Sequence, residues 1–327
     1  MQLLVTGGTG FTGSRLAEYL IDRGHKVNIL DNQKGLFYDT LIDKKANINI
    51  ASVTDRDAVK ESLKDVEGVF HLAAAFRQIN VPKQVYWDVN VEGTRTLCEE
   101  AIKQPLKKFV YCSTQGVHGN IDNPPGNENS PITPADYYQY TKHEGEKVVK
   151  EFTKKGLKTV IIRPTAIYGP GDPERFVYLF KLAKKGKFYM FGNGKAFYHP
   201  VYIENLNDGF YAAFNSDKES AEEYIIGDEE YFTIKELAKK VGESMGISVK
   251  FVHLPFMPLY IGACICEFLC NLVKVTPPLF RRRVDWFRQN RAFVIDKAKQ
   301  EINYQPKVGI EEGLKRTEEW YRENNYI

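Results

Sequence analysis

Residues 3–13 read LLVTGGTGFTG, a short apolar run followed at once by a glycine-rich loop, and this stretch decides the fold. Gly7 permits a tight turn, Gly10 lets the backbone approach a pyrophosphate, and Gly13 lets a helix pack closely on the strand. A helical pattern follows over residues 11–23, so free N–H groups and the positive end of the helix dipole face the loop. Strand, spaced glycines and helix together predict a dinucleotide-binding loop.

Asp31 ends the second apolar run, roughly 20 residues after the last glycine of the loop. A carboxylate at this place accepts hydrogen bonds from a ribose 2′-hydroxyl and repels a 2′-phosphate. Neither Asn32 nor Gln33 is an arginine that could hold such a phosphate. The sequence therefore favours NAD over NADP, although Lys34 leaves NADP open as the less favoured cofactor.

Short apolar runs alternate with longer helical patterns through the first half of the chain, which predicts βαβ units. The expected strands are Leu3–Thr6, Val27–Leu30, Ile48–Ala51, Val69–Ala73, Phe109–Ser113 and Val160–Arg163. We therefore expect an α/β fold, a Rossmann-type doubly wound parallel sheet with a smaller, mainly C-terminal substrate lobe. Its NAD-binding domain is expected over 1–166, rejoined by about 197–220, and the lobe over 167–196 and 221–327.

Capping signals predict two further helices, and apolar spacing predicts a third. Residues 133–136, Thr-Pro-Ala-Asp, are typical of an N-cap, a proline at the first helical position and an acidic third residue, which predicts a helix to about residue 155. Residues 233–236, Thr-Ile-Lys-Glu, form a capping box before a second helix. Apolar spacing predicts a last helix over 310–321.

Composition excludes several classes of protein for this chain of 327 residues. Lys+Arg 45 against Asp+Glu 42 gives a formal net charge of +3, which does not suggest a nucleic-acid binder. The five cysteines suit neither a disulfide framework nor a metal site, so we expect no metal and a reducing compartment, the cytoplasm. Met1 opens no export signal, and charges and prolines interrupt the apolar stretch 254–275, so no transmembrane helix is expected.

Tyr138 and Lys142 are spaced i and i+4, which places both on one face of a helix. An ammonium group close to a phenol favours the phenolate and lowers a pKa that is ordinarily near 10. A tyrosine in this setting can act as a general acid or base near neutral pH. By itself the spacing is common on amphipathic helices, and it gains meaning from the glycine-rich loop.

The two motifs, in this order and separation, resemble the extended short-chain dehydrogenase/reductase superfamily, in particular its NAD-dependent epimerase/dehydratase family. The resemblance covers nearly the whole chain. Further matches are His71-Leu72-Ala73-Ala74, Asn90-Val91-Glu92-Gly93-Thr94, Cys112-Ser113-Thr114, Arg163-Pro164 and Tyr168-Gly169-Pro170. The resemblance implies NAD, a small-molecule substrate and a homodimer.

Carried over residue by residue, the resemblance makes Tyr138 the general acid/base, Lys142 the group that lowers its pKa and holds the nicotinamide ribose, and Thr114 the hydroxyl that binds the reacting oxygen. The implied cofactor-binding residues are Gly7, Gly10, Phe11, Thr12, Gly13, Asp31, Asn32, Ser52, Val53, Leu72, Ala73, Ala74, Asn90, Tyr138, Lys142, Arg163 and Pro164. The implied substrate-binding residues are Thr114, Gln115, Arg175 and His199. This predicts hydride transfer at a secondary alcohol carbon, without a metal.

Departures from the family pattern narrow the chemistry. Gln115 and Gly116 stand where sugar-nucleotide dehydratases of this family carry an Asp-Glu pair, so dehydration by that route is not expected. Residues 195–202 lack the arginine that reaches a diphosphate in many nucleotide-sugar members, although Arg175 or the arginine run 281–283 could replace it.

Three functions remain open at this stage. The first is epimerisation or oxidation of a nucleotide sugar with NAD. The second resembles 3-beta-hydroxysteroid dehydrogenases and dihydroflavonol reductases, which act on apolar alcohols or ketones, and is favoured by the apolar residues 256–273 and by residues 290–306. The third is a non-catalytic NAD-sensing or scaffold protein, against which the intact Tyr138, Lys142 and Thr114 argue.

Overall fold

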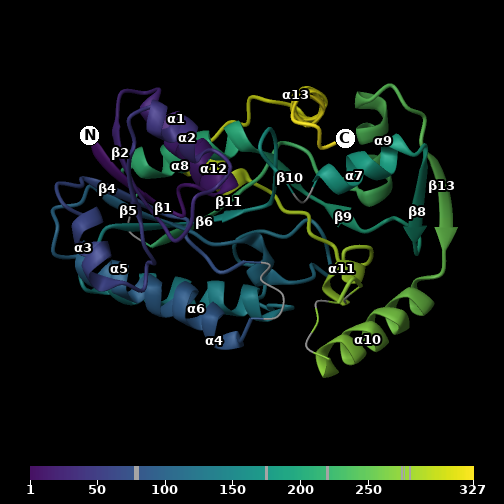
Figure 1. The fold of residues 1–327 in the computed structure, drawn as a ribbon, viewed down its shortest axis with the longest axis horizontal. Helices are drawn as coiled ribbons and strands as arrows, with labels where there is room; N and C mark the ends of the chain where they lie inside the picture. The colour runs from purple at the N-terminus through teal and green to yellow at the C-terminus, as the bar shows by residue number, and fades with distance from the viewer. Residues whose placement is uncertain (77–80, 174–175, 219–220, 274, 276, 280) are drawn as a thin grey trace.

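A parallel sheet forms the centre of the computed structural model, which describes residues 1–327 except 77–80, 174–175, 219–220, 274, 276 and 280 (Figure 1). Its seven strands are β1 (Gln2–Thr6), β2 (Lys26–Asp31), β3 (Asn47–Ile50), β4 (Gly68–His71), β5 (Lys108–Cys112), β6 (Thr159–Pro164) and β11 (Glu222–Ile226). They pair in the order β11-β6-β5-β4-β1-β2-β3, each pair parallel. This order confirms the predicted Rossmann-type doubly wound fold.

Both faces of the sheet are buried. Successive side chains of a strand point to opposite faces, so each strand contributes to two apolar clusters. In β1, Leu3 and Val5 belong to one apolar cluster and Leu4 to another. Strand β5 divides in the same way, with Val110 on the first side and Phe109 on the second. Continuously apolar strands are what a parallel sheet with two covered faces requires.

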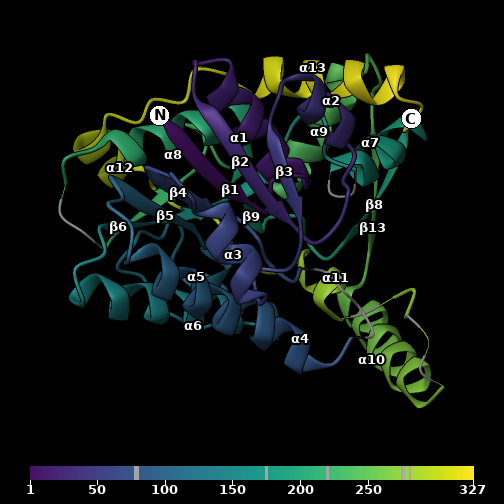
Figure 2. The ribbon, with the colours of Figure 1, turned by 60° about the vertical axis from the view of Figure 1, so that its left-hand side comes forward.

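Helices cover each face of this sheet (Figures 1 and 2). The first face carries α1 (Phe11–Ile21), α2 (Tyr38–Asp43) and α8 (Ile203–Asn215). The second face carries α3 (Arg56–Ser62), α5 (Thr94–Ala101) and α6 (Tyr137–Lys154), with the short α4 (Lys83–Trp87) and a π-helical turn, η1 (Asp88–Gly93), before α5. The carboxyl ends of the strands are left open between these two layers.

The chain returns to the sheet later than the sequence suggests. The expected return ends at about residue 220, whereas β11 extends it to Ile226, because residues 222–226 pair in parallel with β6. The run Glu222–Ile226 is as long as β1, but it begins with two glutamates and not with apolar residues, so the sequence pattern did not identify it as a strand of the sheet.

The remaining elements build the lobe beside the carboxyl ends of the strands. Short paired strands are β7 (Ala166–Tyr168) with β10 (Pro200–Tyr202), β9 (Phe197–Tyr198) with β12 (Phe232–Thr233), and β8 (Lys187–Phe191) with β13 (Lys250–Leu254). Helices of this part are α7 (Phe176–Lys184), α9 (Ile234–Ser244), α10 (Phe256–Leu272), α11 (Arg281–Asp285) and α13 (Ile310–Glu323), besides a 3-10 turn, η2 (Gln115–His118). Helix α12 (Asp296–Ile302) packs on β11 of the sheet and on α8.

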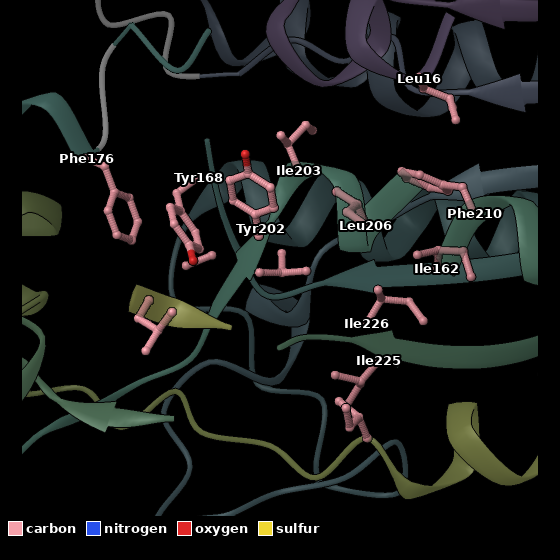
Figure 3. Close-up of a cluster of buried hydrophobic side chains, with 14 of the residues drawn as sticks. Leu16, Ile162, Tyr168, Phe176, Tyr202, Ile203, Leu206, Phe210, Ile225 and Ile226 are labelled. Carbon is pink, nitrogen blue, oxygen red and sulfur yellow. The ribbon is translucent and has the colours of Figure 1, made fainter. Parts of the chain in front are cut away.

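One apolar core joins the sheet to this lobe (Figure 3). Leu16 and Phe210 lie at its sheet end, and Tyr168, Phe176 and Tyr202 lie at its lobe end. The rings of Tyr168 and Phe176 are stacked with their centroids 4.6 Å apart. The two parts of the molecule therefore share buried packing.

The capping predictions have different outcomes. Helix α6 begins at Tyr137, not within 133–136, because Asp136 is its N-cap and accepts a hydrogen bond from the Gln139 N–H at 2.8 Å. The Thr133 hydroxyl is engaged elsewhere, since it donates to the His118 carbonyl at 2.6 Å. The capping box at Thr233 is confirmed as the start of α9.

Helix α13, over Ile310–Glu323, confirms the predicted last helix. Of the helices built from described residues, none has the length and apolar character that crossing a bilayer requires.

Candidate functional site

A cavity of about 1060 Å³ lies at the carboxyl ends of the parallel strands, where such sheets bind their ligands. What we call the sheet wall comes from loops that follow β1, β2, β4 and β5, and it includes residues 10–13, 31–33, 72–76 and 114–116. What we call the lobe wall consists of Tyr178, Leu179, Leu182, Phe188, Tyr198, Trp286, Phe287 and Arg291.

The glycine-rich loop has the shape that a pyrophosphate needs. Gly7 has φ +68°, and a Cβ there would lie 2.7 Å from the Ala73 nitrogen, so no side chain fits. A Cβ on Gly13 would lie 2.0 Å from the Gly7 oxygen, which is why helix and loop can pack only through a glycine. At Gly10 the nearest such atom is 3.5 Å away, so a methyl group there would enter the cavity. The cradle thus fits a bound dinucleotide phosphate.

Asp31 lies at the end of β2 and lines the same cavity. One carboxylate oxygen accepts a hydrogen bond from the Thr9 N–H at 2.9 Å, which ties this side chain to the glycine-rich loop. Gly35 also lines the cavity and was missed by sequence reasoning; a Cβ there would lie 1.9 Å from the Thr9 oxygen, so only a glycine fits beside the loop. The only signal in the sequence is a glycine shortly after the acidic residue, which is too common to interpret alone.

A buried hydrogen-bond chain fixes the loop after β4. The Thr94 hydroxyl donates to the Asn90 carbonyl at 2.8 Å, so it accepts from His71 Nε2 at 2.9 Å. His71 Nδ1 is then the acceptor of the Thr6 hydroxyl at 2.6 Å. Thr6 in turn accepts from the Ala73 N–H at 3.2 Å. Burial lowers the pKa of His71 well below its usual range, which keeps this imidazole neutral.

Asn90 lies behind the sheet wall and does not line the cavity. Its Oδ1 accepts from the Ala75 N–H at 2.8 Å, and its Nδ2 donates to the Ala75 carbonyl at 3.2 Å and to the Thr141 hydroxyl at 3.0 Å. The residue therefore holds the loop after β4 against α6.

Tyr138 and Thr114 bring acid/base groups to the cavity. Tyr138 lies in the first turn of α6 and lines the cavity, with its ring centroid 4.8 Å from that of Phe76. Thr114 lines the cavity at the end of β5, and its Oγ1 accepts from the Gly116 N–H at 3.1 Å. The hydroxyl proton of Thr114 can therefore be donated to a ligand oxygen.

Lys142 lies one turn after Tyr138 and is buried behind the cavity wall. Its Nζ is 4.2 Å from the centroid of the Tyr111 ring, a cation–π contact. Burial lowers the pKa of Lys142 to about 8, while Cys112 and Glu146 act in the opposite direction. The ammonium form therefore still predominates at neutral pH, next to the helical turn that carries Tyr138.

Arg163 lies away from the cavity, in a buried ion pair that sequence reasoning missed. Its Nε and one terminal nitrogen donate to the two carboxylate oxygens of Glu146 at 2.9 and 2.7 Å. The Ser113 hydroxyl donates to the same carboxylate at 2.5 Å. Burial opposes the charge of Glu146, but the hydrogen bonds from Arg163 prevail and lower its pKa to about 2. Arg163 thus connects β6 to α6. Of the two neighbouring residues that were expected to bind the cofactor, Arg163 and Pro164, only Pro164 lines the cavity.

Three predicted substrate-binding residues have separate outcomes. Gln115 lines the cavity, and its buried Oε1 has no hydrogen-bond partner within the described part of the protein. His199 does not line the cavity; it is buried, its Nε2 donates to the Asp228 carbonyl at 2.8 Å, and burial lowers its pKa to about 4. Arg175 lies outside the described residues.

The structure brings most of the other predicted residues together. Those that line the cavity are Gly7, Gly10, Phe11, Thr12, Gly13, Asp31, Asn32, Ser52, Val53, Leu72, Ala73, Ala74, Thr114, Gln115, Tyr138 and Pro164. The lobe wall was not predicted, except that the segment around Arg291 had been singled out. Its aromatic residues come from segments far apart in the chain, and no spacing in the sequence links them.

Comparisons with known proteins agree with this site. A model of the NAD dependent epimerase/dehydratase family matches residues 3–227. The chain is 29% identical to 3beta-hydroxysteroid-dehydrogenase/decarboxylase isoform 1 of Arabidopsis thaliana, covering 96% of this chain and 78% of that one. It is 30% identical to UDP-N-acetyl-alpha-D-glucosaminuronate decarboxylase of Bacillus cytotoxicus, covering 98% and 97%.

A solved structure has the same fold over nearly its whole length. The structure of UDP-glucose 4-epimerase from Thermotoga maritima, with UDP-glucose, superposes with a TM-score of 0.79 at 27% identity, covering 99% of this chain and 100% of that one. The sheet with its covering lobe is therefore shared with a nucleotide-sugar enzyme, and the sequence is similar to sterol enzymes as well.

Proposed function

The chain belongs to the NAD-dependent epimerase/dehydratase family of enzymes, and we propose that it transfers hydride between NAD and a secondary alcohol or ketone carbon of an apolar substrate. The observation that carries this proposal is one cavity lined by the glycine-rich loop, by Asp31 and by the pair Thr114 and Tyr138. The cofactor loop and the acid/base groups thus line one cavity.

The sheet wall holds the cofactor in this proposal. The N–H groups around Gly10 bind the pyrophosphate, the free side of the Asp31 carboxylate accepts from the ribose hydroxyls, and Ala73 and Ala74 leave room beside the sugar and phosphates. The absence of an arginine next to Asp31 supports NAD over NADP. When bound, the nicotinamide supplies the hydride acceptor or donor.

Tyr138 exchanges the hydroxyl proton of the substrate. During oxidation its phenolate accepts that proton, and during reduction its phenol returns it. Thr114 donates a hydrogen bond to the same substrate oxygen and fixes it next to Tyr138. The ammonium group of Lys142 favours the phenolate from behind the wall, where burial strengthens its field. Gln115 and Gly116 provide no carboxylates for dehydration.

The lobe wall favours an apolar ring system or alkyl chain as the substrate. Seven of its residues are aromatic or aliphatic: Tyr178, Leu179, Leu182, Phe188, Tyr198, Trp286 and Phe287. Such a wall makes the binding of an apolar ligand more favourable, because it removes apolar ligand surface from water. Similarity to a hydroxysteroid dehydrogenase/decarboxylase also supports an apolar substrate over the nucleotide sugar, which the sequence left open as the first alternative.

A nucleotide sugar is the second candidate, and Arg291 is the observation that favours it. This residue lines the cavity, and its guanidinium group, one terminal nitrogen of which donates to the Gln289 side chain, supplies the positive charge that attracts a diphosphate. It takes the part of the arginine that residues 195–202 lack. In this alternative, the oxidised sugar is reduced again on the other face, which is epimerisation.

The test offers both substrate classes to the purified protein with NAD. We expect a 3β-hydroxysteroid or a long-chain secondary alcohol to produce NADH, measured by its absorbance, while UDP-glucose and UDP-N-acetylglucosamine stay unchanged in chromatography. Epimerised sugar without oxidation of any apolar alcohol would overturn the apolar assignment and establish the second candidate.

Release of bound nucleotide by acid tests the cofactor assignment separately. We expect NAD to be recovered or, from protein purified empty, added NADH to bind with higher affinity than NADPH. Recovery of NADP would contradict the role of Asp31. Light scattering on the same sample measures whether the protein forms the homodimer that the family resemblance suggests.

A further inference from the structure

Helix α10 projects from the body of the protein and carries an exposed apolar stripe (Figures 1 and 2). Large apolar side chains that are each more than half exposed are Met257, Ile261, Ile265, Phe268, Leu269 and Leu272. Their spacing of three or four residues places them along one face of the helix. Soluble monomers rarely expose a contiguous patch of this kind, so the stripe indicates a binding surface.

The opposite face of α10 makes its contacts within the protein. Ala263 is fully buried there. Glu267, the one charged residue of the helix, pairs with Arg281 of α11, with Nε 2.6 Å from Oε2 and the Arg281 N–H 2.7 Å from Oε1. The rings of Phe256 and Tyr260 are stacked, and the Arg288 guanidinium lies over both. The inner face of α10 thus contacts α11 and Arg288, and the stripe lies on the other face.

Helix α13 shows what an amphipathic helix of this chain does when it belongs to the core. Its apolar residues Ile310, Leu314 and Tyr321 are almost completely buried against the body. Helix α10 has more large apolar side chains than α13, yet it turns them outward. The difference indicates an apolar environment outside the protein.

Charge identifies that environment. The sequence of residues 256–284 contains the single acid Glu267 and four bases, Lys274 and the arginines 281–283. The excess of three positive charges in this short segment equals the formal net charge of the whole chain. A second copy of the protein would carry the same excess of positive charge in this segment, which disfavours a contact between two copies here. An anionic surface would attract them, and it would accept the apolar stripe at the same time.

We propose that α10 docks on the surface of an anionic lipid bilayer, with its stripe at the boundary between headgroups and acyl chains. The helix spans 17 residues, about 25 Å at 1.5 Å per residue, which is shorter than a hydrocarbon core of about 30 Å. It therefore lies in the plane of the membrane surface. Its projection from the body allows a flat surface to contact it along its length.

Docking also brings the cavity close to the membrane surface. Helix α11, paired with α10 through Arg281 and Glu267, is followed at once by Trp286 and Phe287 of the lobe wall. The inference itself does not depend on the proposed reaction, because binding to a membrane requires no substrate and no turnover.

The test measures binding of the full chain to vesicles by flotation. One set of vesicles is pure phosphatidylcholine, and the other contains roughly one third phosphatidylglycerol. We expect the protein to float with the mixed vesicles, to bind pure phosphatidylcholine about tenfold more weakly, and to lose binding to the mixed vesicles as salt is raised. Equal binding to both would overturn the assignment to an anionic surface.

A matched pair of variants locates the contact. Ile261→Ser with Ile265→Ser removes two half-exposed isoleucines from the stripe, and Ile42→Ser with Ile50→Ser removes two of similar exposure from α2 and β3. We expect the first variant to bind mixed vesicles about tenfold more weakly and the second to bind like the original protein. Unchanged thermal unfolding and NADH binding exclude misfolding as the cause.

Other occupants of the stripe give different results. Absence of vesicle binding by the original protein would overturn the proposal. If that protein is also a dimer by light scattering, and Ile261→Ser with Ile265→Ser makes it a monomer, then the stripe is an interface between two copies. Equal loss of vesicle binding in both variants would show that α10 is not the contact.

Discussion

The two walls of the cavity are built from different materials. The sheet wall is rich in glycines and alanines at strand ends, with a few polar side chains such as Asp31 and Thr114, and buried hydrogen bonds such as Thr6–His71 hold it in place. The lobe wall consists of large aromatic and aliphatic side chains with one arginine, contributed by segments far apart in the chain. The first suits a cofactor common to many enzymes, whereas the second suits one particular substrate. Cofactor and substrate binding are therefore separable by mutation.

Replacement of Tyr138 tests the point where the walls meet, and it has the largest expected effect. Tyr138→Phe removes the proton-exchanging hydroxyl, so kcat falls about 10³-fold. The affinity for NADH, measured by fluorescence titration, stays within about twofold, because the pyrophosphate and ribose contacts lie elsewhere on the sheet wall. Tyr140→Phe is the control, since Tyr140 lies on the same helix but does not line the cavity. Turnover that survives in Tyr138→Phe would refute the mechanism.

Replacement of Arg163 tests whether this residue stabilises the fold or binds the cofactor. Arg163→Met leaves Glu146 buried without its partner, which costs about 3–5 kcal/mol of unfolding free energy. Urea unfolding measures this loss, and NADH titration of the folded variant should give an unchanged Kd. Arg316→Met removes an exposed ion-pairing arginine instead and should cost less than about 1 kcal/mol. A raised Kd with intact stability would assign Arg163 to the cofactor after all.

His199, which follows Tyr198 of the lobe wall, should make the free energy of unfolding depend on pH. Burial lowers the pKa of His199 to about 4, so below its unfolded value of about 6.5 the unfolded chain binds the extra proton. Stability is therefore lost as the pH falls from about 7 toward 4. His199→Gln should lose about 2 kcal/mol less than the original protein between about pH 7.5 and pH 5, measured by urea unfolding. Parallel pH profiles for the two proteins would show that His199 does not titrate in this way.

Two variants, one in each wall, test whether cofactor and substrate binding are independent, and they have the smallest expected effects. Asp31→Ala removes the ribose acceptor and should raise the Kd for NADH about tenfold, while the relative affinity for NADPH rises. Trp286→Ala removes apolar surface from the lobe wall and should raise the KM for an apolar alcohol about tenfold, with the Kd for NADH unchanged. If each variant altered both constants equally, the two walls would not be independent.

The sheet wall was predictable from the sequence because backbone geometry fixes it. A glycine that must hold φ +68° against Ala73, as Gly7 does, leaves a signal that spacing alone can identify. The parallel sheet follows from the alternation of strands and helices, and the shared face of Tyr138 and Lys142 follows from their helical spacing. The role of Thr114 comes only from the family resemblance. Arg163 was misplaced because its family motif indicates the right strand end, while the choice between cavity and buried ion pair depends on Glu146, a distant residue.

The lobe wall was not predictable, because its members share no spacing. Tyr178, Tyr198 and Trp286 line one cavity only after three separate segments have folded, and many other aromatic residues of the chain are buried in the core. The predicted start of α6 was wrong for a local reason. Thr133 and Asp136 are both good N-cap residues, and Thr133 instead donates its hydroxyl to the His118 carbonyl, which leaves Asp136 as the cap. Neighbours in space carry this information.

The pairing of β6 with β11 also has a consequence while the protein is being made. Roughly 60 residues separate the two strands, so a ribosome working at about 5–20 residues per second exposes the outer edge of β6 for about 3–12 s before its neighbour emerges. During that interval Val160, Ile161 and Ile162 present an unpaired apolar edge to other chains. A gene shortened to end at codon 220 should therefore yield insoluble protein, although every motif of the sheet wall would be present in it.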